Sequence, residues 1–167
     1  NQMVITPQFG PRLRFSKIFT DMPLAPDTPK PLGVAAFCAI CTKCADNCPV
    51  KAIPQGAPSA EVYNQSNIQG VRKWSVDGEK CFGYWAAQNS DCSICIRVCP
   101  YNKDYTKWWN RWGRRLAGTR LRNVMLMLDT RMGFGQRMKP QSWWAGQREQ
   151  LRQRVRTLIT SFIKSGK

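Results

Sequence analysis

The sequence predicts an α+β protein, and three observations lead to that class. Residues 3–20 contain short apolar stretches with the spacing of strands. Eight cysteines follow in two runs between residues 38 and 99. Residues 103–167 then carry apolar side chains at helical spacing, interrupted by glycine and proline. We therefore expect three regions: 1–32, 33–102 and 103–167.

The N-terminal region is predicted to form two strands joined by a turn. Residues 3–6 (MVIT) are apolar, residues 7–11 (PQFGP) have turn composition, and Leu13, Phe15 and Phe19 alternate with polar residues. A lone hairpin is marginal in water, so these strands need a larger sheet. We expect them to be the end of an incomplete upstream domain or, alternatively, part of the small sheet of the cysteine domain. A proline-rich linker should follow, up to residue 32.

The cysteine spacing is the most specific pattern in the chain. The first run is Cys38-x2-Cys41-x2-Cys44-x3-Cys48-Pro and the second is Cys81-x10-Cys92-x2-Cys95-x3-Cys99-Pro. The first run has the ligand spacing of bacterial two-cluster ferredoxins, and the second has the same spacing with its first interval stretched. The pattern therefore predicts a ferredoxin-like domain that binds two [4Fe–4S] clusters. Its role would be electron transfer.

The spacing also predicts how the cysteines are shared. Three cysteines in a tight loop can take three corners of one cube, and the fourth reaches the other cube. The predicted ligands of cluster 1 are Cys38, Cys41, Cys44 and Cys99. Those of cluster 2 are Cys48, Cys81, Cys92 and Cys95. Disulfides are disfavoured because x2 neighbours have poor geometry for them, and all-cysteine zinc sites do not use x3-C-P arms.

Charge is distributed unevenly along the chain. The formal net charge is +16, and residues 103–167 supply 16 Lys/Arg against three Asp/Glu. Two oxidised clusters with four thiolates each would reduce the total only to about +12, so we expect an acidic partner, an anionic membrane face or a nucleic acid. Histidine is absent from the sequence, which excludes histidine-ligated haem, Rieske centres and Ser/Cys–His catalysis among these residues.

The basic region is also rich in tryptophan. Three interpretations of these tryptophans and the neighbouring arginines stay open: packing against another domain, docking on a membrane surface and stacking on single-stranded nucleic acid. The residues are Trp108, Trp109, Trp112, Trp143 and Trp144. Residues 149–164 carry an apolar stripe that suits a groove, a coiled coil or a membrane surface equally.

Several blocks resemble corrinoid-dependent reductive dehalogenases. They are residues 5–12 (ITPQFGPR), 17–24 (KIFTDMPL), 37–49, 73–77 (KWSVD), 79–82 (EKCF) and 91–103 (DCSICIRVCPYNK). The resemblance extends well over residues 3–110 and loosely over 111–140. It implies a base-off cobalamin in an upstream α/β domain and clusters that pass single electrons to cobalt. Carbon–halogen cleavage of an organohalide would follow.

The resemblance also sets expectations for this chain. As a C-terminal portion it should transfer electrons and dehalogenate nothing alone, because the family's acid, a tyrosine, lies upstream. Arg12 or Arg14 is a candidate for the family's basic pocket residue, although either could be a solvated strand residue. Membrane association at the outer face of the cytoplasmic membrane, with a membrane surface or anchor protein as partner, is implied, or else a cytoplasmic location. The electron donor stays unassigned.

Two alternative functions remain. An epoxyqueuosine reductase-like enzyme uses the same corrinoid and two-cluster chemistry, and a basic tail would suit tRNA. Residues 82–91 and the sequence Tyr101-Asn102-Lys103 look more like dehalogenases, so nucleic acid is the less favoured partner. A free-standing two-cluster ferredoxin would need only residues 33–102.

Overall fold

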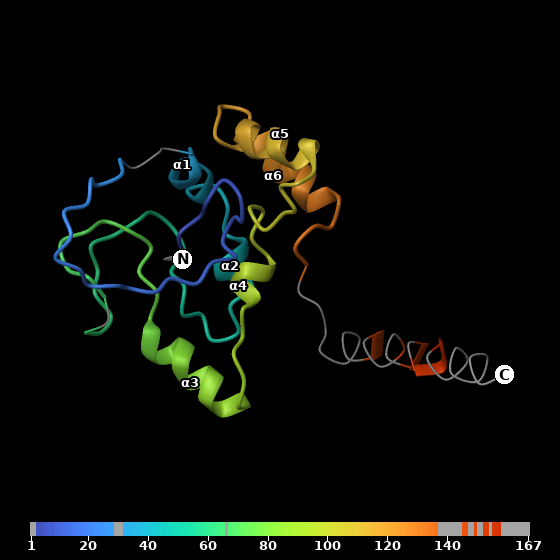
Figure 1. Cartoon of the computed structure of the whole chain (residues 1–167), viewed down its shortest axis with the longest axis horizontal. Helices are drawn as coiled ribbons and strands as arrows, with labels where there is room; N and C mark the ends of the chain where they lie inside the picture. Colours follow the sequence, from blue (N-terminus) through green and yellow to red (C-terminus); the bar gives the residue numbers. More distant parts are fainter. Residues whose placement is uncertain are drawn as a thin grey trace. The chain divides into compact units, whose positions relative to one another are not determined.

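The computed structural model describes residues 3–28, 32–65 and 67–136, and then 145–146, 149, 152–153 and 155–157. It divides into two units, 1–136 and 137–167. The described part of the first unit consists of short helices joined by long irregular connections (Figure 1). The helices are α1 (Val34–Cys38), α2 (Lys43–Asp46), α3 (Gly78–Gln88), α4 (Ile94–Arg97), α5 (Trp108–Ala117) and α6 (Arg122–Arg131).

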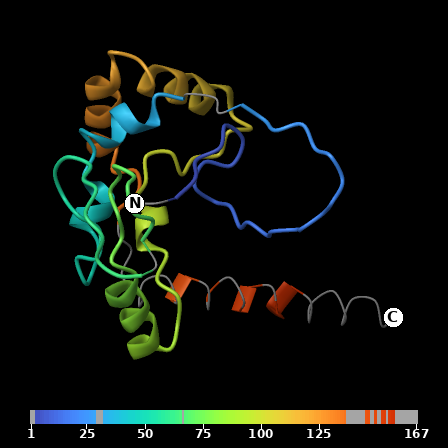
Figure 2. The same cartoon turned by 90° about the vertical axis from the view of Figure 1, so that its left-hand side faces the viewer.

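The two strands expected in residues 3–20 are wrong. Among the described residues the structure has isolated bridges and no strands, and in this segment Thr6 and Gly10 pair around a turn at residues 7–9. The backbone N–H groups of these two residues each donate to the other's carbonyl oxygen, at 3.1 and 3.0 Å. Phe15 and Phe19 are exposed, so the alternating apolar side chains have no packed face that would hold a strand. Residues 12–28 instead form a wide loop that returns to α1 (Figure 2).

The turn at residues 7–9 packs on the segment that follows the second cysteine run. Arg114 donates from its guanidinium to the carbonyl oxygen of Pro7, and Arg12 Nη2 donates to that of Lys103 at 2.8 Å. Gly10 lies against the backbone of Tyr101. The N-terminal segment therefore packs within the first unit.

A substitution at Gly10 tests the contact between the N-terminal turn and Tyr101. Its φ is +59°, and an added Cβ would lie 2.1 Å from the carbonyl oxygen of Tyr101. Gly10→Ala should therefore lower the free energy of unfolding by about 3 kcal/mol, since backbone strain and a steric clash add together. Anaerobic urea titration measures the change.

Gly70 provides the matched control for that substitution. Its φ is +73°, and an added Cβ would meet nothing within 4 Å. Gly70→Ala should cost only the strain, about 1 kcal/mol. Equal losses for the two variants would contradict a close contact between Gly10 and Tyr101.

A small apolar core joins the elements around the first cysteine run. Phe37 of α1 and Tyr101 are each 2% exposed and meet edge to face, with ring centroids 5.3 Å apart. Ala117 of α5 completes the buried centre, and Met125 and Leu126 of α6 pack against it. Cys41 and Cys99 also border this core, which therefore supports part of the cysteine site directly.

A buried ionic cluster connects α6 to the cysteine loops. The carboxylate of Asp129 accepts from Lys43 Nζ at 2.6 Å and from Lys103 Nζ at 2.7 Å. The Lys103 ammonium also lies over the ring of Phe134, 3.9 Å from its centroid. Lys43 lies between Cys41 and Cys44 in the chain, so Asp129 positions the loop that carries these two cysteines.

The helices expected in the basic region are present as α5 and α6, which lie side by side (Figure 1). Trp108, Trp109 and Trp112 of α5 are exposed. Trp143, Trp144 and most of the apolar stripe in residues 149–164 fall outside the described residues. Within the part of the chain that the structure describes, no helix is both long and apolar enough to cross a membrane.

Candidate metal centres

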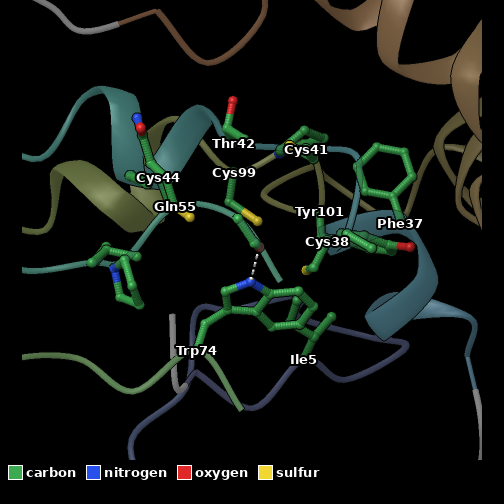
Figure 3. Close-up of a pocket in the computed structure, with 16 residues that line it drawn as sticks. Ile5, Phe37, Cys38, Cys41, Thr42, Cys44, Gln55, Trp74, Cys99 and Tyr101 are labelled. Atoms are coloured by element: carbon green, nitrogen blue, oxygen red, sulfur yellow. Dashed lines mark hydrogen bonds between the residues drawn. The ribbon is translucent and has the colours of Figure 1, made fainter. Parts of the chain in front are cut away.

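Four cysteines surround a first cavity of about 90 Å³. Cys38 ends α1, Cys41 lies in the following turn and Cys44 lies in α2. Cys99 reaches the same cavity from the second run, just beyond α4. Figure 3 shows these four side chains on one side of the cavity, with Trp74 and Ile5 on the other.

The other four cysteines line a second, larger cavity of about 550 Å³: Cys48, Cys81, Cys92 and Cys95. Cys48 comes from the first run and the rest from the second. Each group of four therefore contains three cysteines of one run and the last cysteine of the other. This is the grouping that the spacing predicts.

The short helices α2 and α4 explain why the last cysteine of each run leaves its own group. Cys44 lies in α2 and Cys48 two residues beyond it, while Cys95 lies in α4 and Cys99 two residues beyond it. The two helices contact each other (Figure 1). Each x3 interval thus spans a single helical turn that places its two cysteines at different cavities.

Burial raises the pKa values of the thiols. The pKa of Cys41 rises to about 11 and that of Cys99 to about 12, mainly because burial disfavours the thiolate. Negative charge on Cys38, Cys41 and Cys44 raises the pKa of Cys99 further. Binding a metal group as thiolates would therefore release protons from this site.

The thiols of the second cavity influence one another in the same way. Burial raises the pKa of Cys81, and charges on Cys48 and Cys92 add to the rise. Burial also raises the pKa of Cys95, which feels Cys44 as well as Cys92 and Cys81. Cys44 and Cys95 lie in α2 and α4, which contact each other, so the two cavities are neighbours.

The donor set fits iron–sulfur clusters. All eight cysteines lie among the described residues, and none forms a disulfide. Each cavity offers four thiols, the ligand set of a cubane. The backbone N–H of Ala52 donates to Cys48 Sγ at 3.2 Å, the kind of contact that tunes a cluster. Among the described residues no three Cys, Asp or Glu side chains converge closely enough to hold a single metal ion.

Helix α3 supplies a feature that the cysteine spacing did not predict. The stretched interval between Cys81 and Cys92 is mostly helical, and Tyr84 and Trp85 of α3 line the second cavity. Asp77 caps the helix by accepting from the backbone N–H of Lys80 at 3.1 Å. The sequence contains a signal for the start of this helix, because Asp77, a preferred N-cap residue, comes directly before Gly78 and Glu79.

The two arginine candidates have different positions. Arg12 donates to the backbone carbonyls of Phe9 and Lys103. Its guanidinium therefore connects two segments of the first unit. Arg14 is exposed and lines the second cavity. A role for either side chain in a substrate pocket stays a prediction.

Residues 37–102, which contain all eight cysteines, match the family described as the 4Fe-4S double cluster binding domain. Together with the two groups of four thiols, this match defines the class: the chain is an iron–sulfur protein with two [4Fe–4S] clusters.

Comparison with known proteins identifies homologues of the chain. The chain is 39% identical over 149 residues to the tetrachloroethene reductive dehalogenase of Sulfurospirillum multivorans and 43% identical over 121 residues to that of Desulfitobacterium hafniense. These alignments cover 85% and 70% of the chain. The chain is a homologue of the reductive dehalogenases, which confirms the resemblance.

The chain spans 28% and 22% of the lengths of these two relatives. It is also 29% identical over 127 residues to the epoxyqueuosine reductase of Atelocyanobacterium thalassa. That alignment covers 66% of the chain and 35% of the relative.

Proposed function

We propose that this chain is the electron-transfer part of a reductive dehalogenase, delivering electrons through two [4Fe–4S] clusters to a corrinoid. The adjacent four-cysteine cavities are the main support for this proposal. Cys38, Cys41, Cys44 and Cys99 would hold cluster 1, and Cys48, Cys81, Cys92 and Cys95 would hold cluster 2. When bound, the clusters supply one-electron chemistry. The corrinoid would cleave the carbon–halogen bond of an organohalide.

The chain's own residues position and shield the clusters. The x2 loops and the short helices α2 and α4 direct four thiols into each cavity. Apolar walls around them limit water, one of the factors that set a cluster potential. We further propose that residues 33–102 form the ferredoxin-like domain and that residues 1–32 belong to the end of a corrinoid-binding domain.

Anaerobic reconstitution tests this proposal. The chain loaded with iron and sulfide should contain about eight iron atoms and show the electron paramagnetic resonance (EPR) signals of two reduced [4Fe–4S] clusters. It should pass electrons to an added acceptor. With added cobalamin, reductant and tetrachloroethene, it should release no more halide than cobalamin and reductant release alone. Halide above that level would contradict a purely electron-transferring role.

A second candidate is an epoxyqueuosine reductase-like, tRNA-modifying function. The alignment with epoxyqueuosine reductase and the positive charge of residues 103–167 favour it. In that case tRNA should bind, and the affinity should fall steeply with salt. The identities to the dehalogenases are higher, so the dehalogenase role has the stronger support.

Membrane association at the outer face of the cytoplasmic membrane is our proposal for location, with a cytoplasmic location as the alternative. The exposed Trp108, Trp109 and Trp112 of α5 and the neighbouring Arg111 and Arg115 are suited to an anionic lipid surface. Flotation with anionic and with neutral liposomes separates lipid docking from packing against another protein domain.

A further inference from the structure

Trp74 lines the first cysteine cavity on the side opposite the sulfurs. Its indole ring lies beneath Cys38 and Cys99 in Figure 3, next to Ile5. The indole Nε1 donates to the carbonyl oxygen of Gly56 at 2.8 Å. Because Trp is the largest apolar side chain lining this cavity, its removal would open the widest gap in the wall.

Two backbone contacts fix the position of this ring. The residue before Trp74, Lys73, pairs with Ser59 through two hydrogen bonds of 3.1 and 2.9 Å. The indole hydrogen bond to Gly56 then anchors the side chain to the same connection. Trp74 is thus held by its indole N–H and by the pairing of the residue that precedes it.

Ile5 reaches the cavity from a distant part of the sequence. It borders the apolar core, and the contacts of Pro7 and Arg12 with Arg114 and Lys103 hold its segment in place. Ile5 and Trp74 therefore come from separate segments and meet at one wall of the cavity.

The second cavity is several times larger than the first, at about 550 Å³ against about 90 Å³. The first site is therefore the narrower of the two, and Trp74 and Ile5 are part of its lining. Solvent access is one of the properties that a protein uses to tune a cluster and protect it.

We propose that Trp74, backed by Ile5, is a cover that shields cluster 1 from water and dissolved reagents and so tunes that cluster separately from cluster 2. The inference rests on the proposed assignment of Cys38, Cys41, Cys44 and Cys99 to cluster 1. Trp74 acts through solvent access and not as a ligand.

Cysteine alkylation during iron removal tests the cover. The reconstituted chain is treated with bathophenanthroline and iodoacetamide, and mass spectrometry follows the alkylation of each cysteine over time. Trp74→Ala should speed labelling of the four cluster 1 cysteines about tenfold and leave the four cluster 2 cysteines at their wild-type rate. Trp74→Phe keeps a ring and should stay close to wild type, although it loses the hydrogen bond to Gly56. A redox titration of Trp74→Ala should show a raised potential for one cluster only.

Trp112→Ala is the matched control, because Trp112 is 55% exposed on α5 and lines neither cysteine cavity. It should change no labelling rate. Unchanged rates in Trp74→Ala, or equal acceleration at all eight cysteines, would overturn the cover. If the wild-type chain instead releases its cysteines in the groups 38–48 and 81–99, the cluster assignment itself fails. The two failures are therefore distinguishable.

Discussion

Replacement of Cys99 by alanine is expected to remove cluster 1 and to leave cluster 2 in place. Cys99 belongs to the second run in sequence but lies at the cavity of Cys38, Cys41 and Cys44. Iron in the reconstituted chain should therefore fall from about eight to about four atoms. Alkylation should then reach Cys38, Cys41 and Cys44 and spare the cysteines that line the second cavity.

Cys48→Ala is the reciprocal variant. Cys48 belongs to the first run but lines the cavity of Cys81, Cys92 and Cys95, so those three thiols should become reactive while cluster 1 is kept. If each variant instead exposed the cysteines of its own run, each run would hold its own cluster. The exchange of ligands proposed here would then be wrong.

Replacement of Asp129 by alanine should cause a large loss of stability, because it breaks a buried ionic cluster. The Asp129 side chain is only 8% exposed and pairs with Lys43 and Lys103. Its removal would leave two largely buried ammonium groups without their carboxylate. Loss of one partner from a buried ion pair typically costs 3–5 kcal/mol, so we expect the free energy of unfolding to fall by about 3 kcal/mol in anaerobic urea titration.

Asp21→Ala provides the comparison, since Asp21 is exposed in the loop of residues 12–28. It should leave the free energy of unfolding close to the wild-type value. Lys43 lies in the cluster 1 loop, so Asp129→Ala should also speed iron loss from cluster 1. A variant as stable as wild type would show that the two lysines are solvated without Asp129 and that the ionic cluster does not position α6.

The cysteine groups could be predicted from the sequence because their geometry is local. In the first run two x2 intervals place three thiols in one loop, in the second run one x2 interval follows the stretched one, and in both an x3 interval adds one helical turn before the fourth cysteine. Short-range spacing therefore contains most of the information about these sites. The position of Trp74 at the first cavity could not be predicted in this way. It depends on Gly56 and Ile5, which are distant from Trp74 in the sequence.

The strands expected near the N-terminus show the opposite case. The alternation of Leu13, Phe15 and Phe19 is a real pattern, but a strand also needs a neighbouring strand to pair with and a packed face. In the described residues neither is present for this segment, and Phe19 is 95% exposed. The amphipathic pattern of α5 was read correctly as a helix because helical hydrogen bonds are internal to the segment.

The exchange of cysteines between the two runs has a consequence for biosynthesis. With the proposed ligands, Cys38, Cys41 and Cys44 are translated before Cys99, so the cube that they hold stays one ligand short until Cys99 has been translated. Cluster 2 likewise needs Cys48 from the first run and Cys95 from the second. Neither site can be completed on a nascent chain that ends between the runs, so maturation must wait for nearly the whole domain and should then load both clusters in a concerted manner.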